Sequence, residues 1–338
     1  MTLKEGNFAQ LAHIVAFQSG GPRGQGKRPR AINDASNLMV LCPSCHKLID
    51  DNPALYTRRT LEDYKNRHET HIRHVTGLRP DLKTSILVFT ANIGKQNVFI
   101  PFDQMLEAVS PRYPVSRPGT VIDLTQIHVD GRPSFETASE TIRRRMDRLY
   151  DAESEAQTVK HLSVFALAPI PLLVDLGARL SNKIPTDLFQ RHRDTEDWTW
   201  KRKGKPVEYE FRRLQTGGDP QKVAIILSLS GPIRSADLPR EIDRTFSIYE
   251  FTLKGQAPVV TFLKTKRDLE NFRGAYQMVL STLMRDHPTL KHLHFFPAVP
   301  APIAILCGRE LLPKVHPELL IYDFDKQKVG FTFQLKVN

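Results

Sequence analysis

Residues 161–180 read HLSVFALAPIPLLVDLGARL, and this stretch decides the fold of most of the chain. Its first half, residues 161–169, is almost continuously apolar, which predicts a strand buried on both faces. The apolar run of residues 170–180 then predicts a helix. A buried strand that leads straight into a helix is typical of α/β folds, in which helices cover a mostly parallel sheet.

The same alternation extends on both sides of this stretch. Before it, residues 85–91 predict a buried strand, and residues 135–156 predict a long charged helix. After it, a second round begins near residue 206, with strands over 222–231 and 247–253 and a long helix over 266–285. The repeated rhythm predicts two Rossmann-like halves, approximately residues 85–205 and 206–338.

The first 80 residues have a different pattern of apolar, basic and glycine residues. A short apolar strand over 8–17 precedes a basic loop, residues 18–36, whose glycines and prolines exclude regular structure. A second strand over 37–42 then leads into a helical turn that begins at Pro43. We therefore expect an α+β domain over residues 1–78, a linker over 79–84 and an α/β domain over 85–338.

Composition narrows the functional classes. The 338 residues are about twice a typical domain, and a net charge of +11 suggests a polyanionic partner. No apolar stretch is long enough to span a bilayer, and the N-terminus does not have the pattern of a signal peptide. The three cysteines, Cys42, Cys45 and Cys307, exclude a disulfide framework. We expect a cytoplasmic protein that does not bind membranes.

Three polar residues near the N-terminus suggest phosphodiester hydrolysis. His13 lies on the first predicted strand, Asn37 opens the second, and His46 lies on the turn that follows. This order is similar to that of HNH, or ββα-metal, nucleases. Hydrolysis needs a base for the attacking water and a cation for the phosphate. We assign His13 as the general base, which accepts a proton at Nε2, and His46 as a metal ligand. Asn37 is expected to orient the ring of His13 by accepting a hydrogen bond from its Nδ1–H.

The basic loop between the two strands is expected to bind a nucleic acid. We expect Arg23, Lys27, Arg28 and Arg30 to contact DNA phosphates without reading sequence. The Cys42-x-x-Cys45 motif is only half of a zinc site, so we do not expect zinc there. A site that combines these two cysteines with histidines is the alternative.

Longer motifs resemble a known family. LAHIVAFQSGGPRG (residues 11–24), NDASNLMVLCPSCHKLIDDNPALY (33–56) and LEDYKNRHE (61–69) are similar to the HNH domain of bacterial HNH–SAVED effector nucleases of cyclic-oligonucleotide-based anti-phage signalling. The stretches similar to the SAVED sensor domain are residues 161–180, 187–200, 292–311 and 319–324. The resemblance covers residues 8–338 and implies an HNH domain followed by a SAVED domain of two CARF-like halves.

The resemblance also implies an activity. A cyclic di- or trinucleotide messenger would bind the SAVED domain, drive assembly into a tetramer, and activate cleavage of double-stranded DNA with little sequence preference. Relatives usually carry a further segment ahead of the first strand, whereas 12 residues precede His13 here. Many also carry Asp or His before this histidine, whereas this chain has Ala12. We therefore expect His46 to hold Mg²⁺ with Asp34 or Asp50, with Mn²⁺ and Ni²⁺ as alternatives.

The messenger site is expected where strands lead into helices and where aromatic side chains meet basic ones. Ligands of open α/β sheets bind at the carboxyl ends of strands, and bases stack on aromatic rings. The candidates are Pro169, Pro171, Leu172, Arg193, Trp198, Trp200, Lys201, Ser228, Ser230, Gly231, Pro297 and Ala301. Anchoring of a loop on the core is the alternative role for the two tryptophans.

Two other functions stay open. The HNH domain could belong to a modification-dependent restriction endonuclease, which would cut modified DNA without any added nucleotide. It could instead be a catalytically degenerate module that binds DNA without cutting it.

Overall fold

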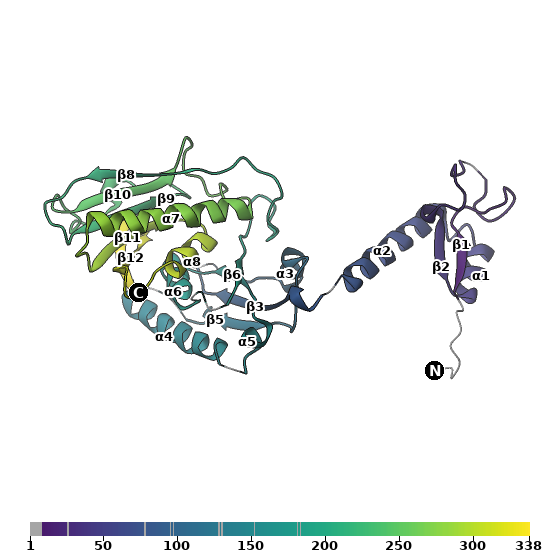
Figure 1. The fold of residues 1–338 in the computed structure, drawn as a ribbon, viewed down its shortest axis with the longest axis horizontal. Helices are drawn as coiled ribbons and strands as arrows, with labels where there is room; N and C mark the ends of the chain where they lie inside the picture. Colours follow the sequence, from purple (N-terminus) through teal and green to yellow (C-terminus); the bar gives the residue numbers. More distant parts are fainter. Residues whose placement is uncertain are drawn as a thin grey trace. The chain divides into compact units, whose positions relative to one another are not determined.

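The computed structural model divides the chain into two compact units, residues 1–79 and 80–338 (Figure 1). It describes residues 9–25, 27–77, 79–94, 96, 98–127, 129, 131–151, 153–180, 182 and 184–338. The division falls inside the linker expected over residues 79–84. Leu78, the expected end of the first domain, and residues 1–8 lie outside the described part.

The N-terminal unit is a two-stranded antiparallel sheet with two helices. Its elements are β1 (Gln10–His13), the short 3-10 helix η1 (Ala35–Asn37), β2 (Leu38–Leu41), α1 (Pro43–Asp51) and α2 (Arg58–Thr76). His13 pairs with Leu38 and Ala12 with Met39. Buried Ala12, Ile14, Ile49 and Leu61 form the core, and His13, which lies between the first two in sequence, is half-buried at the end of β1.

The first half of the C-terminal unit is a parallel sheet. Strand β3 pairs with β6 along one edge and with β4 and β5 along the other, and β7 pairs with β6. The strands are β3 (Lys83–Thr90), β4 (Tyr113–Pro114), β5 (Thr120–Asp123), β6 (Leu162–Leu167) and β7 (Thr186–Leu188). The helices are η2 (Pro80–Leu82), α3 (Phe102–Val109), α4 (Arg132–Leu149), α5 (Glu155–Val159) and α6 (Ile170–Leu180).

The second half is a six-stranded sheet in the order β13-β12-β11-β9-β10-β8. Its four central strands are parallel and both edge strands are antiparallel. The strands are β8 (Tyr209–Gln215), β9 (Val223–Ser228), β10 (Ser247–Leu253), β11 (His292–Ala298), β12 (Glu318–Asp325) and β13 (Gly330–Val337). The helices are η3 (Ser235–Asp237), α7 (Lys266–Asp286) and α8 (Ala301–Arg309).

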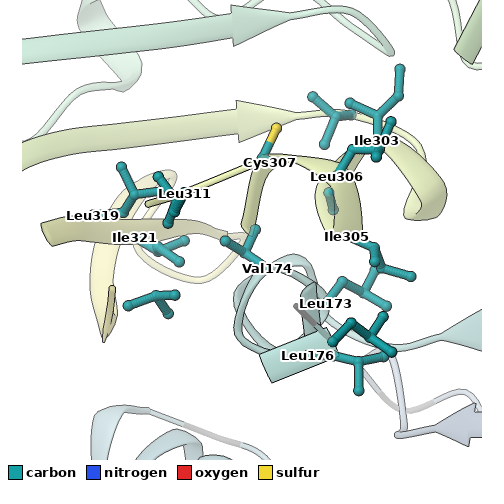
Figure 2. Close-up of a cluster of buried hydrophobic side chains, with 14 of the residues drawn as sticks. Leu173, Val174, Leu176, Ile303, Ile305, Leu306, Cys307, Leu311, Leu319 and Ile321 are labelled. Carbon is teal, nitrogen blue, oxygen red and sulfur yellow. The ribbon is translucent and has the colours of Figure 1, made fainter. Parts of the chain in front are cut away.

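Helices α6 and α8 join the two halves at a close crossing. A β-carbon added to Gly177 would lie 1.9 Å from the main-chain oxygen of Ile305, and one added to Gly308 would lie 1.9 Å from that of Val174. Figure 2 shows Val174 of α6 in the same apolar cluster as Ile305 and Cys307 of α8. Only glycine permits this approach.

The same two helices also reveal a repeat between the halves. Each has proline at its second position and glycine six residues later, Pro171 and Gly177 in α6, Pro302 and Gly308 in α8. The sequence had shown only a shared rhythm of strands and helices. Among the described residues, no helix combines the length and the apolar character needed to cross a membrane.

Candidate active site

His13 ends strand β1 and is held by a residue that the sequence analysis missed. Its Nε2 lies 2.9 Å from Oδ1 of Asn33, and its ring centroid lies 6.0 Å from that of Phe17. A carboxamide oxygen only accepts hydrogen bonds, so Nε2 donates and Nδ1 is the nitrogen left to accept a proton. We had expected Nε2 to be the basic nitrogen. Asn33 is close in sequence to Asn37, and no local signal distinguishes the two.

Asn37 is a positioning residue for the loop and not the partner of His13. Its side chain is buried; Oδ1 accepts from the amide of Val15 at 2.9 Å, and Nδ2 donates to the main-chain oxygens of Val15 at 3.0 Å and Ile32 at 2.8 Å. A buried amide must satisfy both of its polar atoms, and the nearest groups are those of the loop. This corrects the expected hydrogen bond between Asn37 and His13.

His46 and Asp50 form the pair that best fits a metal ion. They lie one turn apart on α1, with His46 Nε2 3.4 Å from Asp50 Oδ2. The other nitrogen, Nδ1, lies 2.9 Å from Oε1 of Gln10, which must accept, so Nε2 carries the lone pair. An imidazole nitrogen and a carboxylate oxygen this close suit a divalent cation.

Asp34 caps a helix, whereas Asp50 lies beside His46. The Asp34 carboxylate caps the 3-10 helix η1 by accepting from the amide of Ser36 at 2.8 Å, and the hydrogen bonds from Ser36 lower the pKa of Asp34. Within the part of the chain that the structure describes, no group of three or more metal-ligating side chains occurs. The pair of His46 and Asp50 would therefore share a cation with water or phosphate oxygens.

Arg23 is buried and does not face solvent, which corrects its predicted contact with DNA. Its side chain is 5% exposed, and Nη2 donates to Oδ1 of Asp50 at 2.6 Å. Nε donates to the main-chain oxygen of Ile14 and Nη1 to that of Ile49, both at 2.8 Å. Arg23 therefore ties the end of β1 to the end of α1, and it orients the carboxylate beside His46.

The other loop cations divide into two kinds. Arg28 donates through Nη2 to the main-chain oxygens of Ala16, at 3.2 Å, and Phe17. The side chains of Lys27 and Arg30 are exposed and make no hydrogen bond or ion pair with other described residues. Lys27 and Arg30 thus stay available for a phosphate, whereas Arg28 shapes the loop.

Ala12 and the two nearby cysteines complete the surroundings of α1. Ala12 is 1% exposed and lies in the core with Ile49 of α1. Cys42 is the N-cap of α1, and its Sγ accepts from the amide of Cys45 at 3.4 Å, which lowers the pKa of Cys42. The thiol of Cys45 in turn contacts Cys42, and this raises the pKa of Cys45.

In the C-terminal unit, the loop between β7 and β8 carries Trp198 and Trp200 and is called the aromatic loop below. Its aromatic side chains anchor it on the core. Trp198 is 1% exposed, and its ring meets that of Phe165 edge-on at 5.3 Å. Trp200 is half-buried and donates from Nε1 to the main-chain oxygen of Leu188, while Lys201 pairs with Asp197 at 2.9 Å. The predicted stacking of a base on Trp198 is wrong, because no part of the ring is free. Arg193 is exposed.

Several predicted ligand positions at the strand ends belong to the core. Pro171, Leu172 and Pro297 are buried, and Ser228 is 1% exposed with its Oγ accepting from the amide of Ile233. The amide of Ser230 donates to Ala298 at 2.7 Å, so it does not offer the N–H expected for a phosphate. This corrects the predictions for these positions. Their side chains are packed in the core, or their polar groups are already hydrogen-bonded within the protein.

Seven of the predicted positions keep accessible surface, namely Pro169, Arg193, Trp200, Lys201, Ser230, Gly231 and Ala301. Pro169 and Ala301 are half-buried where β6 and β11 lead into α6 and α8. A β-carbon on Gly231 would meet no atom within 4 Å, so its backbone faces open space after β9. Arg193, in the aromatic loop, is exposed, and the role of these positions in binding a messenger stays a prediction.

Comparison with known proteins supports both domains. Residues 142–337 match the family model described as SAVED, the SMODS-associated and fused to various effectors sensor domain, and residues 3–52 match that of an HNH endonuclease. No curated protein matches the chain.

The solved structures that the chain matches include the Acinetobacter baumannii Cap4 SAVED/CARF-domain containing receptor with the cyclic trinucleotide 2′3′3′-cAAA. The TM-score is 0.48 and the sequence identity 12%, and the match covers 91% of this chain and 64% of that one. Another is the Moraxella osloensis Cap4 SAVED/CARF-domain containing receptor. Its TM-score is 0.44 and its sequence identity 11%, and the match covers 87% of this chain and 60% of that one. The chain thus spans less than two thirds of the length of each receptor.

The two family models and the sheets confirm the resemblance drawn from the sequence and the predicted fold class. An HNH domain comes first and an α/β domain of two Rossmann-like halves follows. Because the SAVED model matches more than half of its residues, the chain belongs to the SAVED family and carries its sensor domain behind an HNH endonuclease domain.

Proposed function

We propose that this protein is a cytoplasmic anti-phage effector that cuts double-stranded DNA when a cyclic nucleotide binds its SAVED domain. The observation that carries the proposal is the pair of His46 Nε2 and Asp50 Oδ2, 3.4 Å apart on one helix of an HNH domain. Exposed Lys27 and Arg30 in the loop of the same unit provide charge for the DNA backbone.

The reaction is a metal-assisted phosphodiester hydrolysis. His46 and Asp50 would hold a divalent cation, most simply Mg²⁺, which supplies positive charge for the phosphate and the leaving oxygen. Nδ1 of His13 accepts a proton from the attacking water, while Asn33 holds the ring at Nε2. Arg23 keeps the carboxylate of Asp50 turned toward His46. Water attacks phosphorus and the bond from phosphorus to the 3′ oxygen breaks.

Messenger binding belongs to the C-terminal unit. We place a cyclic di- or trinucleotide at the carboxyl ends of the strands, near Pro169, Gly231 and Ala301, with Arg193 for a phosphate. For the messenger to activate the nuclease, it must bind an assembled state, which we take to be a tetramer, more tightly than the free chain.

The test is a plasmid cleavage assay with Mg²⁺ and a panel of cyclic di- and trinucleotides. We expect cleavage with one member of the panel only. His13→Ala should still bind that nucleotide and assemble but lose cleavage. His68→Ala, which removes an exposed histidine on α2, should cut normally and serves as the matched control.

Two outcomes would contradict the proposal. Cleavage of modified plasmid without any nucleotide would identify a modification-dependent restriction endonuclease. Binding of DNA with no cut under any condition of the panel would identify a catalytically degenerate module.

A further inference from the structure

Two exposed thiols lie on the first turn of α1, and the proposed nuclease reaction uses neither. Cys42 is the N-cap of the helix and Cys45 follows three positions later. Both are free and exposed, whereas the third cysteine, Cys307, is free and buried in α8. A small solute can therefore reach two of the three thiols.

The local geometry brings these two sulfur atoms together. Cys42 has an extended backbone, with φ −72° and ψ 158°, so its side chain folds over the first turn and Sγ accepts from the amide of Cys45 at 3.4 Å. The thiol of Cys45 is in hydrogen-bonding contact with Cys42. Pro43 occupies the first helical turn, where no N–H is needed, and fixes its backbone.

A cysteine pair at this spacing on a helix N-terminus is suited to reversible oxidation. The helix N-terminus stabilises negative charge on a sulfur atom that attacks a disulfide, and a partner three residues away can resolve the mixed disulfide. The first turn of α1 is closed over this pair, because the amide of His46 donates to the main-chain oxygen of Cys42 at 2.9 Å.

We propose that Cys42 and Cys45 form a reversible dithiol–disulfide site that reacts with a low-molecular-weight disulfide such as oxidised glutathione. The sulfur of Cys42 attacks one glutathione sulfur, the glutathione disulfide bond breaks, and one reduced glutathione leaves. The sulfur of Cys45 then attacks Cys42, the mixed disulfide breaks, and the second reduced glutathione leaves. Two cysteine thiols are oxidised, one glutathione disulfide is reduced, and both thiol protons pass to glutathione.

The site rests on the geometry of α1 and does not depend on the nuclease reaction. Its disulfide would bridge the N-cap and the first turn of the helix that carries His46 and Asp50. The disulfide would therefore form on the same helix as the two residues that we place at the metal site.

The experiment uses the full chain in buffers with a range of ratios of reduced to oxidised glutathione. Each sample is quenched with acid, labelled with N-ethylmaleimide and digested for mass spectrometry. We expect the peptide with Cys42 and Cys45 to lose both labels together in oxidising buffer and to regain them after dithiothreitol. Cys307 is the internal control and should take up label only after denaturation.

Two single variants test the order of the steps. Cys45→Ser should retain a glutathione mixed disulfide on Cys42, because the resolving thiol is missing. Cys42→Ser should acquire much less glutathione. The proposal is overturned if both thiols stay labelled at every ratio, or if non-reducing gels show disulfides between chains. It is also overturned if a chelator, and not a reductant, restores labelling, since the thiols would then hold a metal ion.

Discussion

Arg23 and Arg30 lie in the same glycine-rich loop, yet their side chains have different surroundings. The side chain of Arg23 is 5% exposed, and the main-chain oxygens of Ile14 and Ile49 and the carboxylate of Asp50 accept its hydrogen bonds. Arg30 extends into solvent. Arg23 therefore holds segments of the unit together, and Arg30 is accessible to a phosphate.

Substitution should separate these two roles. Arg23→Lys cannot reach three acceptors at once, and each buried carbonyl left without a donor costs about 1–3 kcal/mol. We expect a lower unfolding midpoint of the N-terminal unit and loss of cleavage. Arg30→Ala should leave the midpoint unchanged and lower the salt dependence of DNA binding by about one phosphate contact.

Circular dichroism melts and DNA titrations at several salt concentrations would measure both effects. A melt of Arg23→Lys that coincides with that of the parent would show that the buried hydrogen bonds do not hold the unit together. An unchanged salt slope for Arg30→Ala would remove Arg30 from the DNA interface.

At the scale of the element, the crossing of α6 and α8 limits the size of two residues. Gly308→Ala would place a methyl group 1.9 Å from the main-chain oxygen of Val174, so the helices must move apart. Such overpacking costs about 1–3 kcal/mol or more. Gly274 on α7 is the matched control, because a β-carbon there meets no atom within 4 Å.

We expect opposite signs for these two alanine variants. Gly274→Ala should raise the stability of the unit by up to about 1 kcal/mol, since alanine favours helix. Gly308→Ala should lower it. Denaturant titrations of the full chain would measure both, and equal stability of the two variants would rule out the tight crossing.

Buried His161, directly before β6, and half-buried His294 on β11 make the C-terminal unit sensitive to acid. Burial lowers the pKa of His161 to about 4, with nearby Arg112 adding to the effect, and burial also lowers the pKa of His294 to about 4. Both are neutral in the folded unit. Nδ1 of His161 contacts Oγ1 of Thr84 at 2.9 Å, and Nδ1 of His294 contacts the hydroxyl of Tyr322 at the same distance.

The pKa shifts predict the direction of the pH dependence. The unfolded chain takes up a proton on each histidine near pH 6.5, whereas the folded unit does so only near pH 4. Stability is therefore complete above pH 6.5 and falls as the pH drops toward 4. Thermal melts across this range should show the decline, and His294→Gln should make it shallower. A midpoint that is constant from pH 7 to 5 would contradict these shifts.

At the scale of the whole molecule, the two units differ greatly in the core that supports them. Among the described residues of the N-terminal unit, the apolar cluster consists of Ala12, Ile14, Ile49 and Leu61, with partly buried Met39, Leu41 and Tyr56 packed against it. The C-terminal unit has a continuous core that runs through both halves. A small core contributes little stability, because a large share of its surface stays exposed.

This difference predicts two unfolding transitions. A fragment of residues 80–338 should fold alone, bind the activating cyclic nucleotide and melt at the upper transition of the full chain. The lower transition should disappear in the fragment. Calorimetry of both proteins would measure this, and a fragment that is unfolded would show that the C-terminal unit depends on the first 79 residues.

The sequence by itself determined most of the long elements and their order, although the single helix expected over residues 135–156 is divided into α4 and α5. Apolar runs and the glycine and proline residues between them specify local structure, so the buried strands β6 and β9, the helix α6 and the order of His13, Asn37 and His46 could all be predicted. The motifs were long enough to identify an HNH domain followed by a SAVED domain, which the family models confirm.

Only the tertiary structure decided which polar and aromatic side chains are buried and with which partners. Arg23 bonds to Asp50, which is 27 positions away, and Trp198 packs against Phe165. His13 meets Asn33, not Asn37. A pattern over neighbouring residues carries no information about such contacts, because burial depends on which distant segments the fold brings together.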